Sequence, residues 1–109
     1  MMRAVGYAAD VPMLEGRSIT LGDGRRIAVF RTPDGFHAVD GTCPHKGGPL
    51  ADGLVAESCV TCPLHNRRFD LRTGREASGG PGLRAYAVEE RDGRLWVDVP
   101  QAEPLPRAA

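Results

Sequence analysis

Short apolar runs separated by turn residues dominate this 109-residue chain. Asp23-Gly24, Asp34-Gly35 and Asp92-Gly93 each fall between two such runs. Pairs of this kind supply the positive backbone φ that tight hairpin turns need. The pattern therefore predicts hairpins, with strands at 19–21, 26–31, 36–40, 86–90 and 95–99.

The apolar positions also predict which strands are buried. Residues 27–31 read Ile-Ala-Val-Phe-Arg, an almost continuous apolar run typical of a central strand or one buried on both faces. The segment 84–99 alternates instead, which predicts a strand pair with one buried face. The residues expected on that face are Tyr86, Val88, Leu95, Val97 and Val99.

Helical signals are weak in this sequence. Only Val11–Gly16 predicts a helical turn, with Asp10 as its N-cap and Pro12 in the first turn. The chain contains 14 glycines and 9 prolines, which indicates many turns. We therefore predict a mainly β fold, a small antiparallel sandwich or barrel over residues 1–100, with a loose tail at 101–109.

Composition narrows the function more than the fold. Lys plus Arg equals Asp plus Glu, 14 against 14, so we expect neither a nucleic acid nor a membrane surface as partner. No apolar run is long enough for a secretory signal or a membrane span, so we expect a cytoplasmic protein. A single small domain also implies that multi-step redox chemistry would be shared with partners.

Cysteine and histidine residues gather in the middle of the chain. Cys43 and His45 lie two positions apart, and Cys62 and His65 lie three apart. Each pair offers one thiolate and one imidazole on a proline-containing loop. Thiols in a cytosolic chain more often bind metal or do chemistry than form disulfides, so these residues are candidate metal ligands.

Two metal centres use two cysteines and two histidines. Zinc takes such a set tetrahedrally, but its sites more often begin with a close cysteine pair. A [2Fe–2S] centre can carry both histidines on one iron. The split arrangement favours the diiron centre, with Cys43 and Cys62 on the inner iron and His45 and His65 on the outer.

The sequence around these ligands resembles the Rieske domain. The similarity lies in Cys43-Pro44-His45 and Cys62-Pro63-Leu64-His65, followed by Phe69-Asp70 and Thr73-Gly74. It covers about residues 3–99. The resemblance implies one Rieske-type [2Fe–2S] cluster per chain, two stacked antiparallel sheets, and a cluster-binding sub-domain over about 41–83.

Two departures from high-potential Rieske proteins bear on the redox potential. Those proteins join their ligand loops by a disulfide, and the corresponding positions here are Gly48 and Leu64. Their serine and tyrosine hydroxyl donors correspond to Arg67 and Phe69. With fewer hydrogen bonds to the reduced cluster, we expect a redox potential of about −150 mV rather than about +300 mV.

For the other polar residues near these loops we expect structural roles, with a functional alternative for some of them. We interpret Cys59 as a buried strand cysteine and His37 as an ordinary strand histidine. Asp40 and Asp70 are candidate hydrogen-bond partners of the ligand loops or turn residues. Segment 78–82 is either a third loop over the metal centre or a connector. A basic face formed by Arg67, Arg68, Arg72 and Arg75 is solvated or contacts an acidic partner.

The resemblance leaves two partners open. The run 45–53 and Cys62–Asn66 look most like the small subunit of assimilatory NAD(P)H-dependent nitrite reductase, an enzyme of nitrate assimilation. That resemblance implies a large redox subunit that reduces nitrite. The alternative is a Rieske ferredoxin that serves a ring-hydroxylating oxygenase and its reductase. A zinc-stabilised interaction module is the third hypothesis. No catalytic residue is expected in the chain itself.

Overall fold

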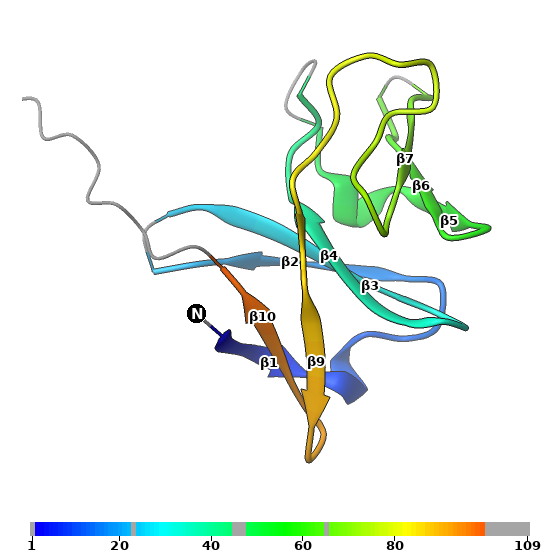
Figure 1. Ribbon diagram of the computed structural model, residues 1–109. Helices are drawn as coiled ribbons and strands as arrows, with labels where there is room; N and C mark the ends of the chain where they lie inside the picture. Colours follow the sequence, from blue (N-terminus) through cyan, green and yellow to red (C-terminus); the bar gives the residue numbers. More distant parts are fainter. Residues whose placement is uncertain (1, 23, 45–47, 65, 100–109) are drawn as a thin grey trace, which may run out of the picture.

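The computed structural model describes residues 2–22, 24–44, 48–64 and 66–99, and these residues form three antiparallel sheets (Figure 1). The first has the strand order β2 (Gly16–Thr20), β3 (Arg26–Thr32), β4 (Gly35–Asp40) and β8 (Ala85–Tyr86). The second runs β1 (Met2–Tyr7), β10 (Arg94–Asp98) and β9 (Val88–Arg91). The third runs β5 (Leu54–Ala56), β6 (Cys59–Thr61) and β7 (Arg68–Asp70).

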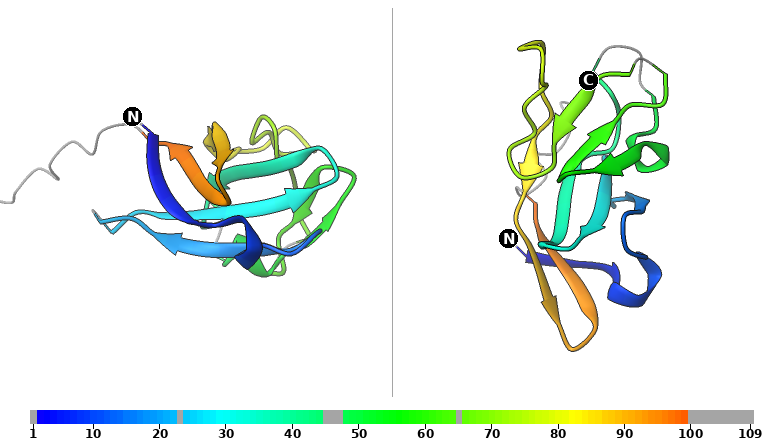
Figure 2. Two further views of the ribbon diagram at one scale, coloured as in Figure 1. Left: turned by 90° about the horizontal axis from the view of Figure 1, so that it is seen from below. Right: turned by 90° about the vertical axis from the view of Figure 1, so that its right-hand side faces the viewer.

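The four-stranded sheet lies between the two three-stranded sheets (Figures 1 and 2). The β5–β6–β7 sheet sits at one end, and the β1–β10–β9 sheet at the other. The mainly β, antiparallel fold predicted from the sequence is confirmed. The third sheet falls within the 41–83 stretch expected to hold the metal centre. The predicted tail at 101–109 lies outside the described residues.

Strand β3 separates two hydrophobic cores. Ile27, Ala28, Val29 and Phe30 are all fully buried, as the continuous apolar run predicted. Because side chains alternate along a strand, Ala28 and Phe30 enter one core while Ile27 and Val29 enter the other. The second of these cores also contains the expected face of 84–99, with Tyr86, Leu95, Val97 and Val99 buried in it and Val88 packed against it.

The hairpin between β9 and β10 forms as predicted. Arg91 pairs with Arg94, so Asp92 and Gly93 make a two-residue turn with φ of 52° and 79°. The β3–β4 hairpin differs in detail, because Thr32 pairs with Gly35 and the central turn residues are therefore 33 and 34. Of its Asp-Gly pair, only the glycine has a positive φ. In the first predicted turn, Asp23 lies outside the described residues.

The predicted helical turn at Val11–Gly16 is wrong. The structure places a single 3₁₀ turn earlier, at Ala8–Asp10, and Val11 closes it. Residues 12–15 form a tight turn instead, within which Leu14 adopts a left-handed φ of 63°. Gly16 starts β2 and pairs with Phe30, and position 16 has to be a glycine because a Cβ there would lie 2.5 Å from the Phe30 ring. Within the described residues no helix is long and apolar enough to cross a membrane.

Candidate metal centre

The two candidate thiol ligands lie in the same hydrophobic core. Cys43 is 2% exposed and Cys62 is fully buried, and both belong to the core that contains Phe30 and Phe69. They come from segments 19 residues apart in the chain, one after β4 and one after β6. The two candidate histidine ligands, His45 and His65, lie outside the described residues.

The first ligand loop is pinned at both of its ends. The Cys43 N–H donates to the Gly48 carbonyl at 2.9 Å, and the Leu50 N–H donates to the Gly41 carbonyl at 3.1 Å. A β-bridge also joins residues 42 and 49. The second 3₁₀ turn, Leu50–Asp52, follows at once. The two described ends of this loop, 41–44 and 48–50, are therefore held against each other.

The second ligand loop is the tip of the β6–β7 hairpin. The Cys62 N–H donates to the Arg67 carbonyl at 2.8 Å, and the Asn66 N–H donates to the Cys62 carbonyl at 3.1 Å. Asn66 adopts a left-handed φ of 54°, a conformation that asparagine tolerates better than most residues. Thr61 pairs with Arg68 just below this loop. The hairpin ladder therefore fixes where Cys62 lies.

The two ligand loops touch at Gly48. A Cβ on this residue would lie 3.3 Å from the Cys62 sulfur and 3.0 Å from Cδ1 of Leu64. A glycine is therefore needed for the first loop to approach the second thiol so closely. Positions 48 and 64, predicted to replace the disulfide of high-potential proteins, do lie side by side. Both cysteines of the centre are free thiols.

Neither position 67 nor position 69 brings a hydroxyl to the loops. Phe69 is fully buried in the same core as Cys43 and Cys62. Arg67 directs its guanidinium to Glu76, with Nη1 3.6 Å from Oε1. The apolar ring and the paired cation leave the hydroxyl-donor positions of high-potential Rieske proteins without a hydroxyl.

Glu76 organises the third loop, and no sequence motif marked it as part of the site. Its Oε2 accepts hydrogen bonds from the Ser78 N–H, the Ser78 hydroxyl and the Gly80 N–H at 2.7, 2.6 and 3.0 Å. The hydrogen bond from the Ser78 hydroxyl and that from the Gly80 N–H hold the pKa of Glu76 below its usual value, with Arg67 adding to this. Residues 78–80 of this segment are therefore held against Glu76.

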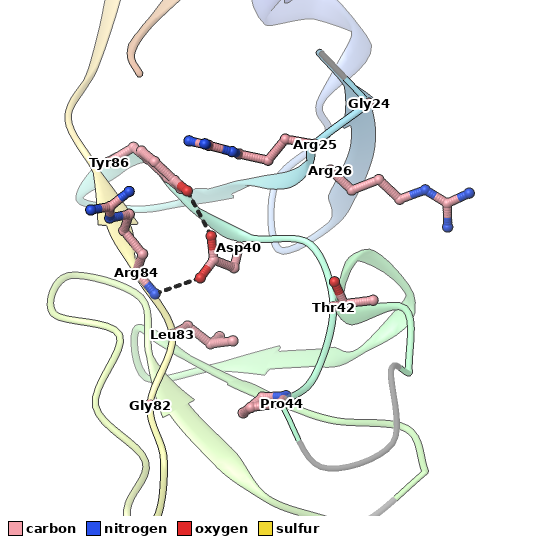
Figure 3. Close-up of a pocket in the computed structure, with 10 residues that line it drawn as sticks. All are labelled: Gly24, Arg25, Arg26, Asp40, Thr42, Pro44, Gly82, Leu83, Arg84 and Tyr86. Carbon is pink, nitrogen blue, oxygen red and sulfur yellow. Dashed lines mark hydrogen bonds between the residues drawn. The ribbon is translucent and has the colours of Figure 1, made fainter. Parts of the chain in front are cut away.

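Asp40 joins the base of the first ligand loop to the strand that follows the third loop. Its carboxylate accepts the Tyr86 hydroxyl at 2.6 Å and the Arg84 N–H at 2.8 Å (Figure 3). It lies in an open cavity of about 770 Å³ that also reaches Pro44. Burial, and then the hydrogen bond to Asp40, raise the pKa of Tyr86. Asp40 thus holds strands together at the edge of the centre.

The remaining candidates have structural places in the fold. Cys59 lies on a strand, β6, as predicted, but the prediction that it is buried is wrong: it is half-buried and lies outside the core that holds the other two cysteines, because it is the first residue of a short strand of the outer sheet. His37 hydrogen-bonds the Thr32 hydroxyl at 3.0 Å, and burial lowers its pKa. Asp70 accepts the Arg72 N–H at 2.8 Å and so shapes the turn after β7.

The basic face predicted after the second loop is largely paired. Arg67 faces Glu76, Arg68 lies 3.8 Å from Glu57, and Arg72 lies 3.8 Å from Asp70. Three of the four arginines therefore have an acidic neighbour within this chain. The face offers less net positive charge to an acidic partner than the sequence alone indicated.

Comparison with known proteins identifies the centre. The Rieske [2Fe-2S] domain matches residues 2–91. The chain belongs to the Rieske [2Fe-2S] family. Its electron-transfer domain carries a Rieske-type [2Fe–2S] cluster, which decides between the two metal centres considered from the sequence.

Similar proteins include dioxygenase ferredoxins and a nitrite reductase small subunit. The 3-phenylpropionate/cinnamic acid dioxygenase ferredoxin subunit of Escherichia coli K12 is 32% identical over 99 residues, covering 88% of this chain and 92% of its own. The ferredoxin of carbazole 1,9a-dioxygenase from Nocardioides aromaticivorans IC177 is 28% identical, with a TM-score of 0.77 and coverage of 89% and 96%. A Mycobacterium tuberculosis protein described as an NADH-dependent nitrite reductase small subunit is 23% identical, with a TM-score of 0.85 and coverage of 94% and 97%.

The described residues fit a Rieske cluster. Two buried thiols from two closed loops lie in one apolar core, and Gly48 brings the loop backbone against one of them. A Rieske cluster needs cysteine from both loops, backbone N–H groups close to its sulfurs and little water around them. The sequence spacing supplies a histidine beside each cysteine.

Proposed function

We propose that Cys43, His45, Cys62 and His65 hold the cluster, with the cysteines on one iron and the histidines on the other. Two features support this assignment. Cys43 and Cys62 share one core, although 18 residues separate them in sequence. Each also belongs to a Cys-x-His or Cys-x-x-His box in a family whose cluster uses that ligand set.

The proposed function is one-electron transfer to or from a larger oxidoreductase. The cluster, when bound, accepts and donates a single electron. Four protein ligands leave no open coordination position, so a substrate has nowhere to bind the metal. This chain's own residues bury the thiols, close both ligand loops and keep the apolar Phe69 beside them. The carrier therefore depends on a partner for chemistry on a substrate.

Of the two partners, we propose a ring-hydroxylating oxygenase system first. The observation that favours it is the 32% identity to a dioxygenase ferredoxin subunit over nearly the full length of both chains. The second candidate is the large subunit of a nitrite reductase. It is favoured by the residues of 45–53 and by the shared fold of a nitrite reductase small subunit, although at 23% identity that likeness speaks for the fold alone.

Ligand substitutions test the proposed site. His65→Ala and Cys62→Ser should lose the visible absorption of the cluster, with iron and acid-labile sulfide falling well below two per chain. Cys59→Ser is the matched control, because that thiol lies outside the core of the centre, and it should keep the full spectrum. An intact spectrum in His65→Ala would show that the ligand assignment is wrong.

The partner is tested by mixing the reduced protein anaerobically with each candidate. We expect rapid reoxidation by a purified ring-hydroxylating oxygenase and no stable complex with a sirohaem-containing nitrite reductase large subunit. If only the nitrite reductase subunit reoxidised the reduced protein, and the oxygenase did not, the nitrite reductase would become the proposed partner.

A further inference from the structure

Glu76 is a buried carboxylate that the proposed ligand set does not use. Its side chain is 3% exposed, and its Oε2 accepts three hydrogen bonds from Ser78 and Gly80. A carboxylate taken out of water is tolerated only where hydrogen bonds and an opposite charge compensate its lost hydration. The segment 78–80 supplies the hydrogen bonds by folding around this one side chain.

The opposite charge comes from the second ligand loop. Oε1 of Glu76 lies 3.6 Å from Nη1 of Arg67, and the Arg67 carbonyl accepts the Cys62 N–H. A Cβ on Gly80 would lie 3.5 Å from the same guanidinium nitrogen. Glu76 therefore joins the third loop to the residue that closes the loop around Cys62.

We infer that Glu76 is a positioning residue of the metal centre: it locks segment 78–80 against the second ligand loop, and its charge, balanced by Arg67, helps to set the cluster's midpoint potential. This inference rests on the proposed function. The reduced cluster carries one more electron than the oxidised cluster. A nearby carboxylate disfavours that electron and a nearby guanidinium favours it, more strongly where water is excluded.

The neighbouring pair Arg68–Glu57 provides a comparison on the same three-stranded sheet, β5–β6–β7. Its two side chains are 50% and 88% exposed, and their charged atoms lie 3.8 Å apart. Solvent screens such an exposed pair, so removing the charge of Glu57 should change the midpoint potential only slightly. Glu57→Gln is therefore a control that changes the same charge at an exposed site of the β5–β7 sheet.

The test is redox potentiometry on the purified, cluster-loaded variants Glu76→Gln, Arg67→Gln, the double variant and Glu57→Gln. The glutamine at 76 retains an oxygen that can accept the Ser78 and Gly80 N–H groups. We expect the midpoint potential to rise in Glu76→Gln, to fall in Arg67→Gln, and to return close to wild type in the double variant. Glu57→Gln should shift it less than either single variant.

Opposite signs separate a charge effect from simple loosening of the loops, which would move both single variants in the same direction. Shifts of the same sign, or shifts no larger than that of Glu57→Gln, would overturn the inference. Amide hydrogen exchange gives a second readout: exchange at Ser78 and Gly80 should accelerate in Glu76→Ala, and unchanged protection would overturn the locking role. A wild-type protein without a Rieske spectrum would instead overturn the proposed function and this inference together.

Discussion

At the scale of single residues, Asp40 shows how one carboxylate braces the edge of the centre. From its place just before the first ligand loop, the sequence made it a candidate hydrogen-bond partner of the ligand loops or a turn residue. In the structure it bonds Tyr86 and Arg84, residues 46 and 44 positions further along the chain. Because those two contacts join β4 to the stretch that returns from the third loop, Asp40 supports the geometry of the first ligand loop.

Tyr86→Phe should lower the free energy of unfolding by about 1.5–3 kcal/mol, the usual range for a hydrogen bond to a charged group. Urea denaturation of the cluster-loaded protein measures this loss. The control is Tyr7→Phe, because Tyr7 is 55% exposed and its hydroxyl loss should change stability by less than about 0.5 kcal/mol. Equal unfolding midpoints for the two variants would refute the role given to the Asp40 contact.

The same hydrogen bond predicts an alkaline limit to stability. The pKa of Tyr86 is raised above its ordinary value of 10.0 in the folded protein. The unfolded chain therefore loses the proton first, and the contribution of Tyr86 is fully present below about pH 10. It disappears as the pH rises through the folded-state pKa. Tyr86→Phe should flatten this alkaline decline, whereas a slope unchanged from wild type would contradict it.

At the scale of elements, the turn after β7 depends on Gly74. The sequence motif contains this glycine but does not show why the position requires one. Gly74 has a φ of 79°, and a Cβ there would lie 1.9 Å from the Leu83 carbonyl oxygen. Its own carbonyl accepts the Leu83 N–H at 2.7 Å. The backbone of Gly74, before the third loop, and that of Leu83, after it, therefore lie in direct contact and close the loop.

Gly74→Ala should cost at least about 3 kcal/mol, because it combines a left-handed residue with a backbone clash. Gly93→Ala is the matched control: Gly93 has the same φ of 79° but nothing within 4 Å of its Cβ position. It should lose only about 1–2 kcal/mol, the cost of the left-handed conformation alone. Chemical denaturation measures both variants, and similar losses would show that the contact with Leu83 does not constrain the loop.

Turn chemistry explains which elements could be predicted. The Asp92-Gly93 turn was predictable because both residues suit positive φ. The β5–β6 turn was not, because Glu57 and Ser58 adopt φ of 52° and 62° without a glycine or asparagine to signal it. Tertiary contacts hold them there instead: the Ser58 hydroxyl donates to Asp34 at 3.1 Å, and its carbonyl accepts the Leu71 N–H.

At the scale of the whole molecule, β3 separates two hydrophobic cores. One core contains the two candidate thiol ligands, and the other packs beneath the β1–β10–β9 sheet. The ligand boxes could be recognised from sequence because each is a short motif. Glu76 could not, because its partner Arg67 lies nine positions earlier and only the folded hairpin brings them together. The neutral overall charge leaves recognition of a partner to local surfaces, and most of the basic face is paired internally.

The absence of hydroxyl donors at positions 67 and 69 predicts a low potential for the whole domain. Phe69 fills the core beside both thiols, and Arg67 is committed to Glu76. Hydrogen bonds to the cluster stabilise its reduced form, so fewer of them hold the potential down.

A redox titration of the purified protein, followed by electron paramagnetic resonance, tests the central claim most directly. We expect a Rieske-type signal that appears in a single one-electron step, with a midpoint potential of about −150 mV. A colourless protein that holds one zinc ion, or a Rieske signal with a clearly positive midpoint, would contradict it.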